Sequence, residues 1–361
     1  MLTPWQHVPF QSLLAEHGLA GLPEREFPTD GWSGARFSLI ERGRDRFVIK
    51  RTSPAIDWIA AATEDHFVRE AWLAATWFGG SSELAYIGAG DDGDVAAILL
   101  PDLSVELIAW DRPEHETALP VNALDRVLRA LANLHAVPWP GLLEEDRPFP
   151  WTPLPERLLL TSRQMCARHI ASGIPAGVTS AERLLAGWDA FDRRAPRLAR
   201  SLVDDLSADV TPLVRALSRL PSVGLHGDLK LANVALGPGD RVRFIDWSMT
   251  IVAPVAVELG WFLVSNSGSL PERPDRVLER YRRAASSVPE HEVIPGADRE
   301  ARVIGDWQLQ IDLAMIVGLL LRGFRKGLDA EAGVTLASGE SAVDDLAWWC
   351  DQAVAASARL T

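Results

Sequence analysis

The chain has 361 residues, of which 47% are hydrophobic and 24% are charged, and its formal net charge is −13. This length fits two lobes around one cleft, and the composition is that of a folded globular protein. The negative charge argues against nucleic acid as a partner, because gripping a phosphate backbone needs a positive face. An acidic surface either favours a cationic substrate or only keeps the protein soluble, and both interpretations stay open.

The number of cysteines and the length of the apolar runs indicate where in the cell the protein is expected. Two cysteines, Cys166 and Cys350, are too few for a disulfide framework and fit a reducing cytoplasm. The first ten residues contain no basic stretch followed by an apolar core, so no signal peptide is predicted. The apolar run 314–321 is far shorter than a bilayer span and is interpreted as a buried helix. We therefore expect a cytoplasmic protein without a membrane partner.

The first hundred residues are predicted to be rich in strands. A loop signal with two glycines covers residues 29–34. Apolar spacing over residues 62–77 predicts one helix. Strand-like runs lie on either side of that helix, at residues 36–40, 46–50, 85–88 and 95–100.

After residue 103 the pattern becomes helical. Apolar residues recur at spacings of three and four around residues 124–134, which predicts a helix with one buried face. Further helical patterns follow at residues 155–172, 180–206 and 210–220. A β-like segment then covers residues 224–247. We expect an α+β fold with two lobes, a small β-rich lobe over residues 1–103 and a larger helical lobe over residues 104–361.

The strongest chemical signal is the segment HGDLKLAN, which contains Asp228 and Asn233, followed by the apolar run VRFI and Asp246. The turn 237–240 would fold that run back onto residues 233–236, so that the three oxygen-bearing side chains converge. Phosphoryl transfer needs a carboxylate to orient the attacking hydroxyl and oxygen ligands for magnesium. The alternative is a set of unrelated polar residues in turns, which would make both the spacing and the position of Asp246 coincidental.

The arrangement HGDxxxxN followed by IDW resembles the aminoglycoside phosphotransferase and choline kinase family, within the protein-kinase-like fold. The resemblance spans residues 30–263 and is strongest in the catalytic segment. It implies that Asp228 is the catalytic base and that Asn233 and Asp246 bind Mg²⁺. It also implies that Glu258, in VELGWFL, supports the catalytic loop, while His226 is interpreted as a brace of that loop.

The resemblance further implies a strand lysine that contacts the nucleotide phosphates and a helical glutamate that holds it. Lys50, at the end of FVIK, and Glu70, in VREA, fit these roles in order and separation. Alone, each would be interpreted as a solvated charge. Ser33 and Gly34, in TDGWSGA, are candidates for phosphate contacts, although this loop lacks the GxGxxG spacing and an ordinary turn is an equal alternative.

The segment ILLPDL resembles the strand that leads into the family's hinge, where backbone groups bind adenine. Pro101 has no N–H and can offer only its carbonyl, whereas Leu103 can donate. The expected nucleotide is ATP, with GTP as the alternative.

Two residues depart from the family pattern. Lys230 stands where small-molecule kinases often have His, Gln or Trp, and in many protein kinases a lysine at that place contacts the transferred phosphate. Lys230 is therefore a catalytic candidate, and it raises the alternative of a protein kinase. Ser248 follows Asp246 and Trp247, where the family often has an acidic residue.

The acceptor is expected to bind against the helical lobe. Trp307 and Asp312 are candidate contacts, because acidic residues of these helices often bind cationic acceptors in the family, but a solvated or locally paired Asp312 is the favoured alternative. The prediction is a kinase that phosphorylates a hydroxyl of an aminoglycoside, amino alcohol, sugar or amino sugar. A catalytically silent nucleotide-binding regulator on the same fold is the main alternative.

Overall fold

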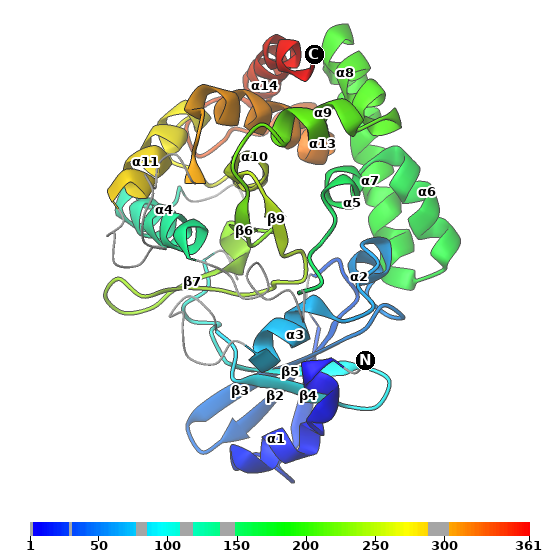
Figure 1. Cartoon of the computed structure of the whole chain (residues 1–361), viewed down its shortest axis with the longest axis vertical. Helices are drawn as coiled ribbons and strands as arrows, with labels where there is room; N and C mark the ends of the chain where they lie inside the picture. The colour runs from blue at the N-terminus through cyan, green and yellow to red at the C-terminus, as the bar shows by residue number, and fades with distance from the viewer. Residues whose placement is uncertain (1–2, 29–30, 77–84, 109–117, 138–148, 288–302) are drawn as a thin grey trace.

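The computed structural model describes residues 3–28, 31–76, 85–108, 118–137, 149–287 and 303–361. A sheet-rich N-terminal lobe lies at the bottom of Figure 1, and a larger helical lobe lies above it. Two short two-stranded sheets lie between the five-stranded sheet and most of the helices (Figure 1). The α+β class with two lobes is thereby confirmed.

The N-terminal sheet is antiparallel, with the strand order β1-β2-β3-β5-β4. Alternate residues of β5 face opposite sides, as the pleat requires. Ala96 and Ile98 pack with α3, whereas Ala97 and Leu99 pack with α1. Helices thus cover both faces of the sheet. The elements of this lobe are η1 (Pro4–His7), α1 (Phe10–Glu16), β1 (Glu24–Phe27), β2 (Arg36–Arg42), β3 (Asp45–Thr52), α2 (Trp58–Ala62), α3 (Arg69–Thr76), β4 (Gly88–Asp91) and β5 (Ala96–Pro101).

The prediction of a single helix over residues 62–77 is wrong. Glu64 and Val68 both have φ of +52°, a left-handed conformation that no α-helix can continue through. The Asp65 carboxylate accepts a hydrogen bond from the Arg69 backbone N–H at 2.9 Å and so starts α3. Glu70, in the first turn of α3, is buried. The strand predicted at 85–88 begins only at Gly88, and β1 was not predicted because its side chains are mostly exposed.

The helical lobe is built around α13, a 26-residue helix that packs against α7, α10 and α14. Two predicted helices are each divided in two, and Pro196 stands at the second break, before α8. The helices are α4 (Val121–Ala136), α5 (Leu154–Leu159), α6 (Arg163–Ser172), α7 (Pro175–Arg194), α8 (Arg197–Ala208), α9 (Thr211–Leu217), α10 (Val255–Ser265), α11 (Pro274–Ser287), α13 (Trp307–Ala332), α14 (Ala342–Ala356) and η4 (Ser357–Leu360).

Among the described helices, α13 alone has the length and apolar character that a bilayer span would need. However, 72% of its most apolar stretch is buried inside the protein. The backbones of α10 and α13 also approach closely, since a Cβ on Gly260 would lie 2.5 Å from the Ala314 carbonyl oxygen. The apolar surface of α13 is therefore the core of the helical lobe.

The predicted hairpin in the catalytic segment is confirmed. Strand β7 (Val234–Leu236) pairs antiparallel with β8 (Val242–Phe244), and the turn 237–240 joins them. Strand β6 (Val223–Leu225) pairs with β9 (Ile251–Ala253), and η2 (Leu231–Asn233) precedes β7. The loop between β6 and β7 and the end of β8 therefore lie together, and they face the N-terminal lobe (Figure 1).

Candidate active site

Lys50 connects the two lobes. Its Nζ lies 2.6 Å from Oε2 of Glu70, on α3, and 2.7 Å from Oδ1 of Asp246, which follows β8. Lys50 is 5% exposed and Glu70 is 1% exposed. Three of the residues predicted for the site therefore meet where the lobes join.

Lys50 and Asp246 stabilise each other's charged forms, whereas burial raises the pKa of Glu70. Burial alone would lower the pKa of the Lys50 ammonium, but the carboxylates of Asp246 and Glu70 raise it above its usual value. Burial would likewise raise the pKa of Asp246, but the ammonium groups of Lys50 and Lys230 hold it well below its usual range. Lys50 and Asp246 are thus both charged at neutral pH.

Tyr86 is a member of this group that was not predicted. Its hydroxyl donates to Oε1 of Glu70 at 2.8 Å and accepts from the Trp247 backbone N–H at 3.4 Å. Both oxygens of the Glu70 carboxylate therefore accept hydrogen bonds, Oε1 from Tyr86 and Oε2 from Lys50. The sequence contains no local pattern for this contact, because Tyr86 and Trp247 are 161 residues apart.

Asp228 is held through one carboxylate oxygen. Its Oδ2 accepts from Lys230 Nζ at 3.2 Å and from Asn233 Nδ2 at 3.3 Å, and Asn233 Nδ2 also donates to the Asp228 carbonyl at 2.9 Å. Within the described chain, the buried Oδ1 of Asp228 has no hydrogen-bond partner. A buried carboxylate oxygen without a donor is unusual, and it suits an atom that receives a proton from a substrate hydroxyl.

Asn233 and Asp246 are brought together by the hairpin, since the Ile245 backbone N–H donates to the Asn233 carbonyl at 3.0 Å. The amide nitrogen of Asn233 is used by Asp228, which leaves its amide oxygen for a metal. Asp246 has φ of +66°, and its Oδ1 accepts from Lys50 and from the Ser248 hydroxyl. One ionised carboxylate and one amide oxygen fit Mg²⁺, which usually takes few protein ligands and completes its shell with phosphate and water.

Glu258, on α10, anchors the catalytic loop from the side of the helical lobe. Its carboxylate accepts from the backbone N–H groups of His226 at 2.9 Å and Gly227 at 2.8 Å. It also lies 3.3 Å from Nε2 of His135, whose Nδ1 is 2.7 Å from the Tyr281 hydroxyl. These contacts suit the supporting role that the resemblance implies for Glu258. The contacts of His135 with Glu258 and with Tyr281 were not predicted from the sequence.

His226 braces the same loop. Its Nδ1 lies 3.2 Å from the Asp228 backbone N–H, which can only donate, so Nδ1 accepts. Nε2 then carries the proton and donates to the Ile245 carbonyl at 2.9 Å. The ring is therefore occupied at both nitrogens and links the catalytic loop to the strand that precedes Asp246.

The loop that contains Ser33 and Gly34 lies against the start of α2. Gly34 has φ of +99°, and a Cβ there would lie 2.2 Å from the Ile56 carbonyl oxygen, so only glycine fits. The Ser33 carbonyl accepts from the Trp58 backbone N–H at 3.0 Å. Asp57, at the start of α2, is buried, and burial raises its pKa while the nearby Lys50 ammonium opposes the rise. The loop therefore adjoins the Lys50 group.

Pro101 and Leu103 lie at the end of β5. Pro101 pairs with Phe47 of β3, and Leu103 is buried against Ala85 and Ala235. Within the described chain, no hydrogen bond uses the Leu103 N–H, whereas its carbonyl accepts from Glu106 at 2.8 Å. Their expected contacts with adenine stay predictions.

Trp307 and Asp312, the predicted acceptor contacts on α13, already have protein partners. Asp312 accepts from Arg359 at 2.8 Å and from Gln308 at 2.8 Å. Trp307 stacks on Tyr281 with ring centroids 6.3 Å apart. No described contact joins either residue to Asp228, and their role with a substrate stays a prediction.

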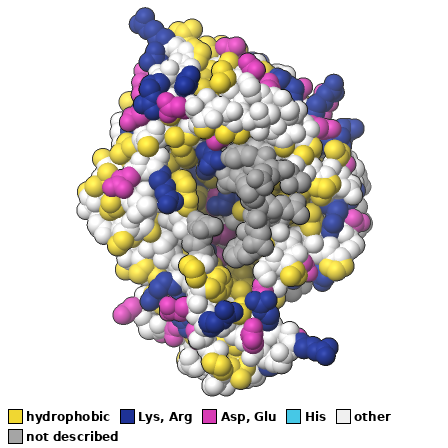
Figure 2. Space-filling view, turned by 180° about the vertical axis from the view of Figure 1, so that it is seen from behind, with side chains coloured by type: hydrophobic (Ala, Val, Ile, Leu, Met, Phe, Trp, Pro, Cys, Tyr) yellow, Lys and Arg dark blue, Asp and Glu magenta, His cyan; other side chains and the backbone are white. Residues whose placement is uncertain are grey.

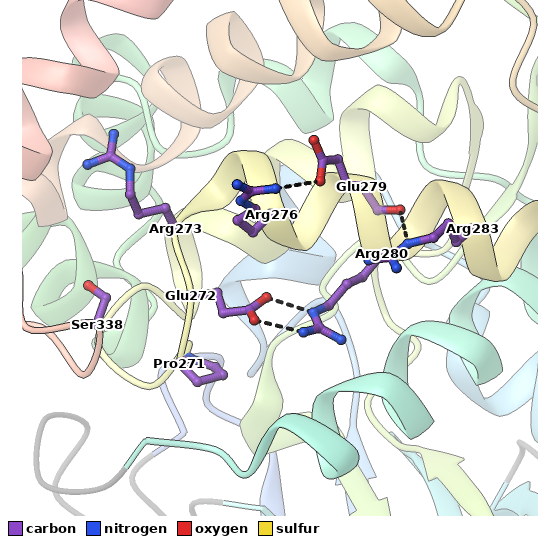
Figure 3. A pocket seen from close by; sticks show the side chains of 8 residues that line it. All are labelled: Pro271, Glu272, Arg273, Arg276, Glu279, Arg280, Arg283 and Ser338. Carbon is purple, nitrogen blue, oxygen red and sulfur yellow. Dashed lines mark hydrogen bonds and ion pairs between the residues drawn. The ribbon is translucent and has the colours of Figure 1, made fainter.

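A hollow near the middle of the molecule shows basic and acidic side chains next to one another (Figure 2). A separate pocket, shown in Figure 3, lies beside α11 and is lined by four arginines. Carboxylates accompany them, since Arg280 makes two hydrogen bonds with Glu272 at 2.6 and 2.7 Å, and Arg276 pairs with Glu279 at 3.2 Å. None of the residues that line this pocket belongs to the Lys50 and Asp228 groups, so it is not the candidate active site.

Comparison with known proteins identifies the family of the chain. The sequence model described as the phosphotransferase enzyme family matches residues 24–296, which include the Lys50 and Asp228 groups. No curated protein matches the chain.

Several solved structures are similar to the chain. A Ralstonia eutropha JMP134 protein assigned to the aminoglycoside phosphotransferases is 13% identical, with 97% of each chain covered and a TM-score of 0.50. An aminoglycoside phosphotransferase from Alicyclobacillus acidocaldarius is 16% identical, with 94% of this chain and 91% of that chain covered and a TM-score of 0.41. Choline kinase from Streptococcus pneumoniae is 10% identical, with 96% and 97% covered and a TM-score of 0.48. The likeness to the Ralstonia protein shows a shared fold and confirms the predicted kinase-like architecture.

Proposed function

The chain belongs to the phosphotransferase enzyme family, and we propose that it transfers the γ-phosphoryl group of ATP to a hydroxyl group of a small molecule in the presence of Mg²⁺. The observation that carries the proposal is the convergence of Lys50, Glu70 and Asp246 beside a catalytic loop whose Asp228 keeps one carboxylate oxygen free of protein donors. This combination supplies a cation for phosphates, a metal ligand and a base.

Residues 1–103 would form the nucleotide-binding lobe. Lys50, held by Glu70, would contact the α- and β-phosphates, and the loop with Ser33 and Gly34 would cover them. The backbone at Pro101 and Leu103 would bind the base, with ATP expected and GTP as the alternative. Support comes from the carboxylates of Asp246 and Glu70, which keep the buried lysine charged by raising its pKa.

Residues 104–361 would supply the metal ligands and the base. Asn233 and Asp246 would hold Mg²⁺, which when bound neutralises negative charge on the phosphates. Oδ1 of Asp228 would accept the proton of the attacking hydroxyl and aim its oxygen at the phosphorus. Lys230, whose Nζ lies 3.2 Å from Oδ2 of Asp228, would contact the transferred phosphoryl group.

The acceptor would be an aminoglycoside, an amino alcohol, a sugar or an amino sugar, as the family resemblance implies. Asp312 and Trp307 would be reached only if their present contacts with Arg359 and Tyr281 were exchanged for contacts with a ligand. We also propose that the protein acts in the cytoplasm, where ATP is supplied and where two unpaired thiols persist.

The test is ADP release from ATP and Mg²⁺ against a panel of amines, amino alcohols, sugars and aminoglycosides. We expect release that depends on one class of acceptor and stops when Mg²⁺ is chelated. Thermal stabilisation by ATP and Mg²⁺ without turnover of any acceptor would instead indicate a silent nucleotide-binding regulator. Transfer of labelled phosphate to generic protein acceptors would indicate a protein kinase.

A further inference from the structure

We infer that Arg157, on α5, is a positioning residue for the catalytic loop: its guanidinium fixes the Gly227 carbonyl and thereby the place of Asp228. The inference rests on the proposed role of Asp228. Neither the sequence motifs nor the family pattern drew attention to Arg157, which lies 70 residues before the loop that it contacts.

The contact itself is specific. Nε and Nη2 of Arg157 both donate to the Gly227 carbonyl oxygen, at 2.8 and 2.7 Å, and the side chain is fully buried. The carbonyl of Gly227 and the N–H of Asp228 belong to one planar peptide group. Arg157 holds the oxygen of that group, and Nδ1 of His226 accepts from its N–H at 3.2 Å. The peptide plane that leads into Asp228 is therefore fixed at both ends.

The backbone of Gly227 needs to be fixed because it directly precedes Asp228. Gly227 has φ of +82°, and a Cβ there would lie 1.9 Å from the Met249 carbonyl oxygen, so glycine is required. Glycine also has the freest backbone of any residue, and a rotation of its carbonyl would swing the next side chain. Glu258 grips the Gly227 N–H at 2.8 Å, and Arg157 grips the carbonyl. Together they remove the freedom that glycine introduces directly before the proposed base.

The surroundings of the Arg157 guanidinium leave the Gly227 carbonyl as its hydrogen-bond partner within the described chain. Within the described chain, Arg157 forms no ion pair, and its third nitrogen, Nη1, has no hydrogen-bond partner. Burial lowers the pKa of Arg157, and the more distant carboxylates of Asp228 and Glu258 oppose that fall. The guanidinium carbon lies 4.4 Å from the centre of the Trp261 ring, and that of Arg322 lies 5.1 Å from the same ring. Removing the guanidinium would leave the Gly227 carbonyl without these two donors, which itself costs stability. The test of the inference therefore measures the rate per folded molecule.

The decisive variant is Arg157→Met, which fills a similar volume and cannot bond the carbonyl. Because a misplacement of about 1 Å costs roughly 100-fold in rate, we expect kcat per folded molecule to fall about 100-fold while KM for ATP changes less than about threefold. Arg157→Lys keeps one donor and should lie between this variant and the wild type. Guanidinium ion, below unfolding concentrations, should restore part of the kcat of Arg157→Ala. Arg163→Met is the matched control, because Arg163 also lies over a tryptophan, Trp188, but pairs with Asp192 away from the loop.

A crystal structure of Arg157→Met gives a readout that does not depend on turnover. We expect the Gly227 carbonyl to rotate and the Asp228 carboxylate to leave its contacts with Lys230 and Asn233. An unmoved Gly227 peptide, or a kcat within about threefold of wild type, overturns the inference. If the wild-type chain releases ADP with none of the acceptors in the panel, the proposed function is contradicted instead. The crystal structure of Arg157→Met would still decide the role of Arg157.

Discussion

Nζ of Lys50 lies 2.7 Å from Oδ1 of Asp246, although 196 residues separate them in the chain. This ion pair joins the sheet of one lobe to the catalytic hairpin of the other. Both groups are also the ones that a nucleotide with its metal would need, the ammonium for phosphate and the carboxylate for magnesium. The site therefore lies where the two lobes meet.

Replacing Lys50 tests the nucleotide side of this pair. In Lys50→Met we expect kcat/KM to fall about 100- to 1,000-fold, because one preorganised cation for the phosphates is lost. Steady-state kinetics at varied ATP concentration measures the change. Arg51→Met is the matched control, because Arg51 points to Glu24 and Asp92 instead. Equal losses in both variants would contradict the assignment of Lys50.

The catalytic segment could be predicted because its residues are near neighbours in the chain. Asp228 and Asn233 lie in one loop, and a turn with two glycines returns the strand that ends at Asp246. Lys50 and Glu70 were predicted from their order and separation, with the resemblance as the guide. The start of α3 was not predicted, because the left-handed residues Glu64 and Val68 interrupt the helix expected over residues 62–77.

Residues that contact the site from distant segments could not be predicted. Tyr86 reaches Trp247 and Arg157 reaches Gly227 across long stretches of chain. No periodicity or spacing encodes such contacts, since they depend on how whole helices pack. The local pairing that was the favoured alternative for Asp312 agrees with its contact with Gln308, four residues away, whereas its contact with Arg359 lies 47 residues away.

Glu258 should matter for stability as well as for the loop. Its carboxylate is buried, and although burial alone would raise its pKa, the hydrogen bonds and charge of His135 lower it below the usual value. Removing a buried, bonded charge commonly costs about 3–5 kcal/mol, so we expect Glu258→Ala to lose that much unfolding free energy. Urea denaturation followed by circular dichroism measures it. Glu331→Ala, at an exposed ion pair with Arg193, should leave the transition unchanged.

If Glu258→Ala unfolds at the same urea concentration as the wild type, the backbone contacts of Glu258 with His226 and Gly227 are not what holds the loop. The result would also weaken the inference for Arg157, since the two residues grip the same glycine.

The two thiols should be unreactive in the native protein. Burial raises the pKa of Cys166 to about 11 and that of Cys350 to about 12. A raised thiol pKa keeps the protonated, unreactive form at pH 8, and unfolding returns the pKa to its ordinary value and exposes the sulfur. We expect a thiol-reactive chromogenic disulfide to label neither cysteine before unfolding and both after it. Rapid labelling of the native chain at pH 8 would show that one thiol is accessible.

The most direct test of the proposed mechanism is acceptor-dependent ADP release by Asp228→Asn beside the wild type. The amide keeps the size of the side chain but cannot act as a base, so we expect phosphotransfer to fall at least about 100-fold while ATP with Mg²⁺ still stabilises the folded protein against heat. The control Asp240→Asn, in the exposed turn between β7 and β8, should keep wild-type turnover. Full turnover by Asp228→Asn would contradict the account.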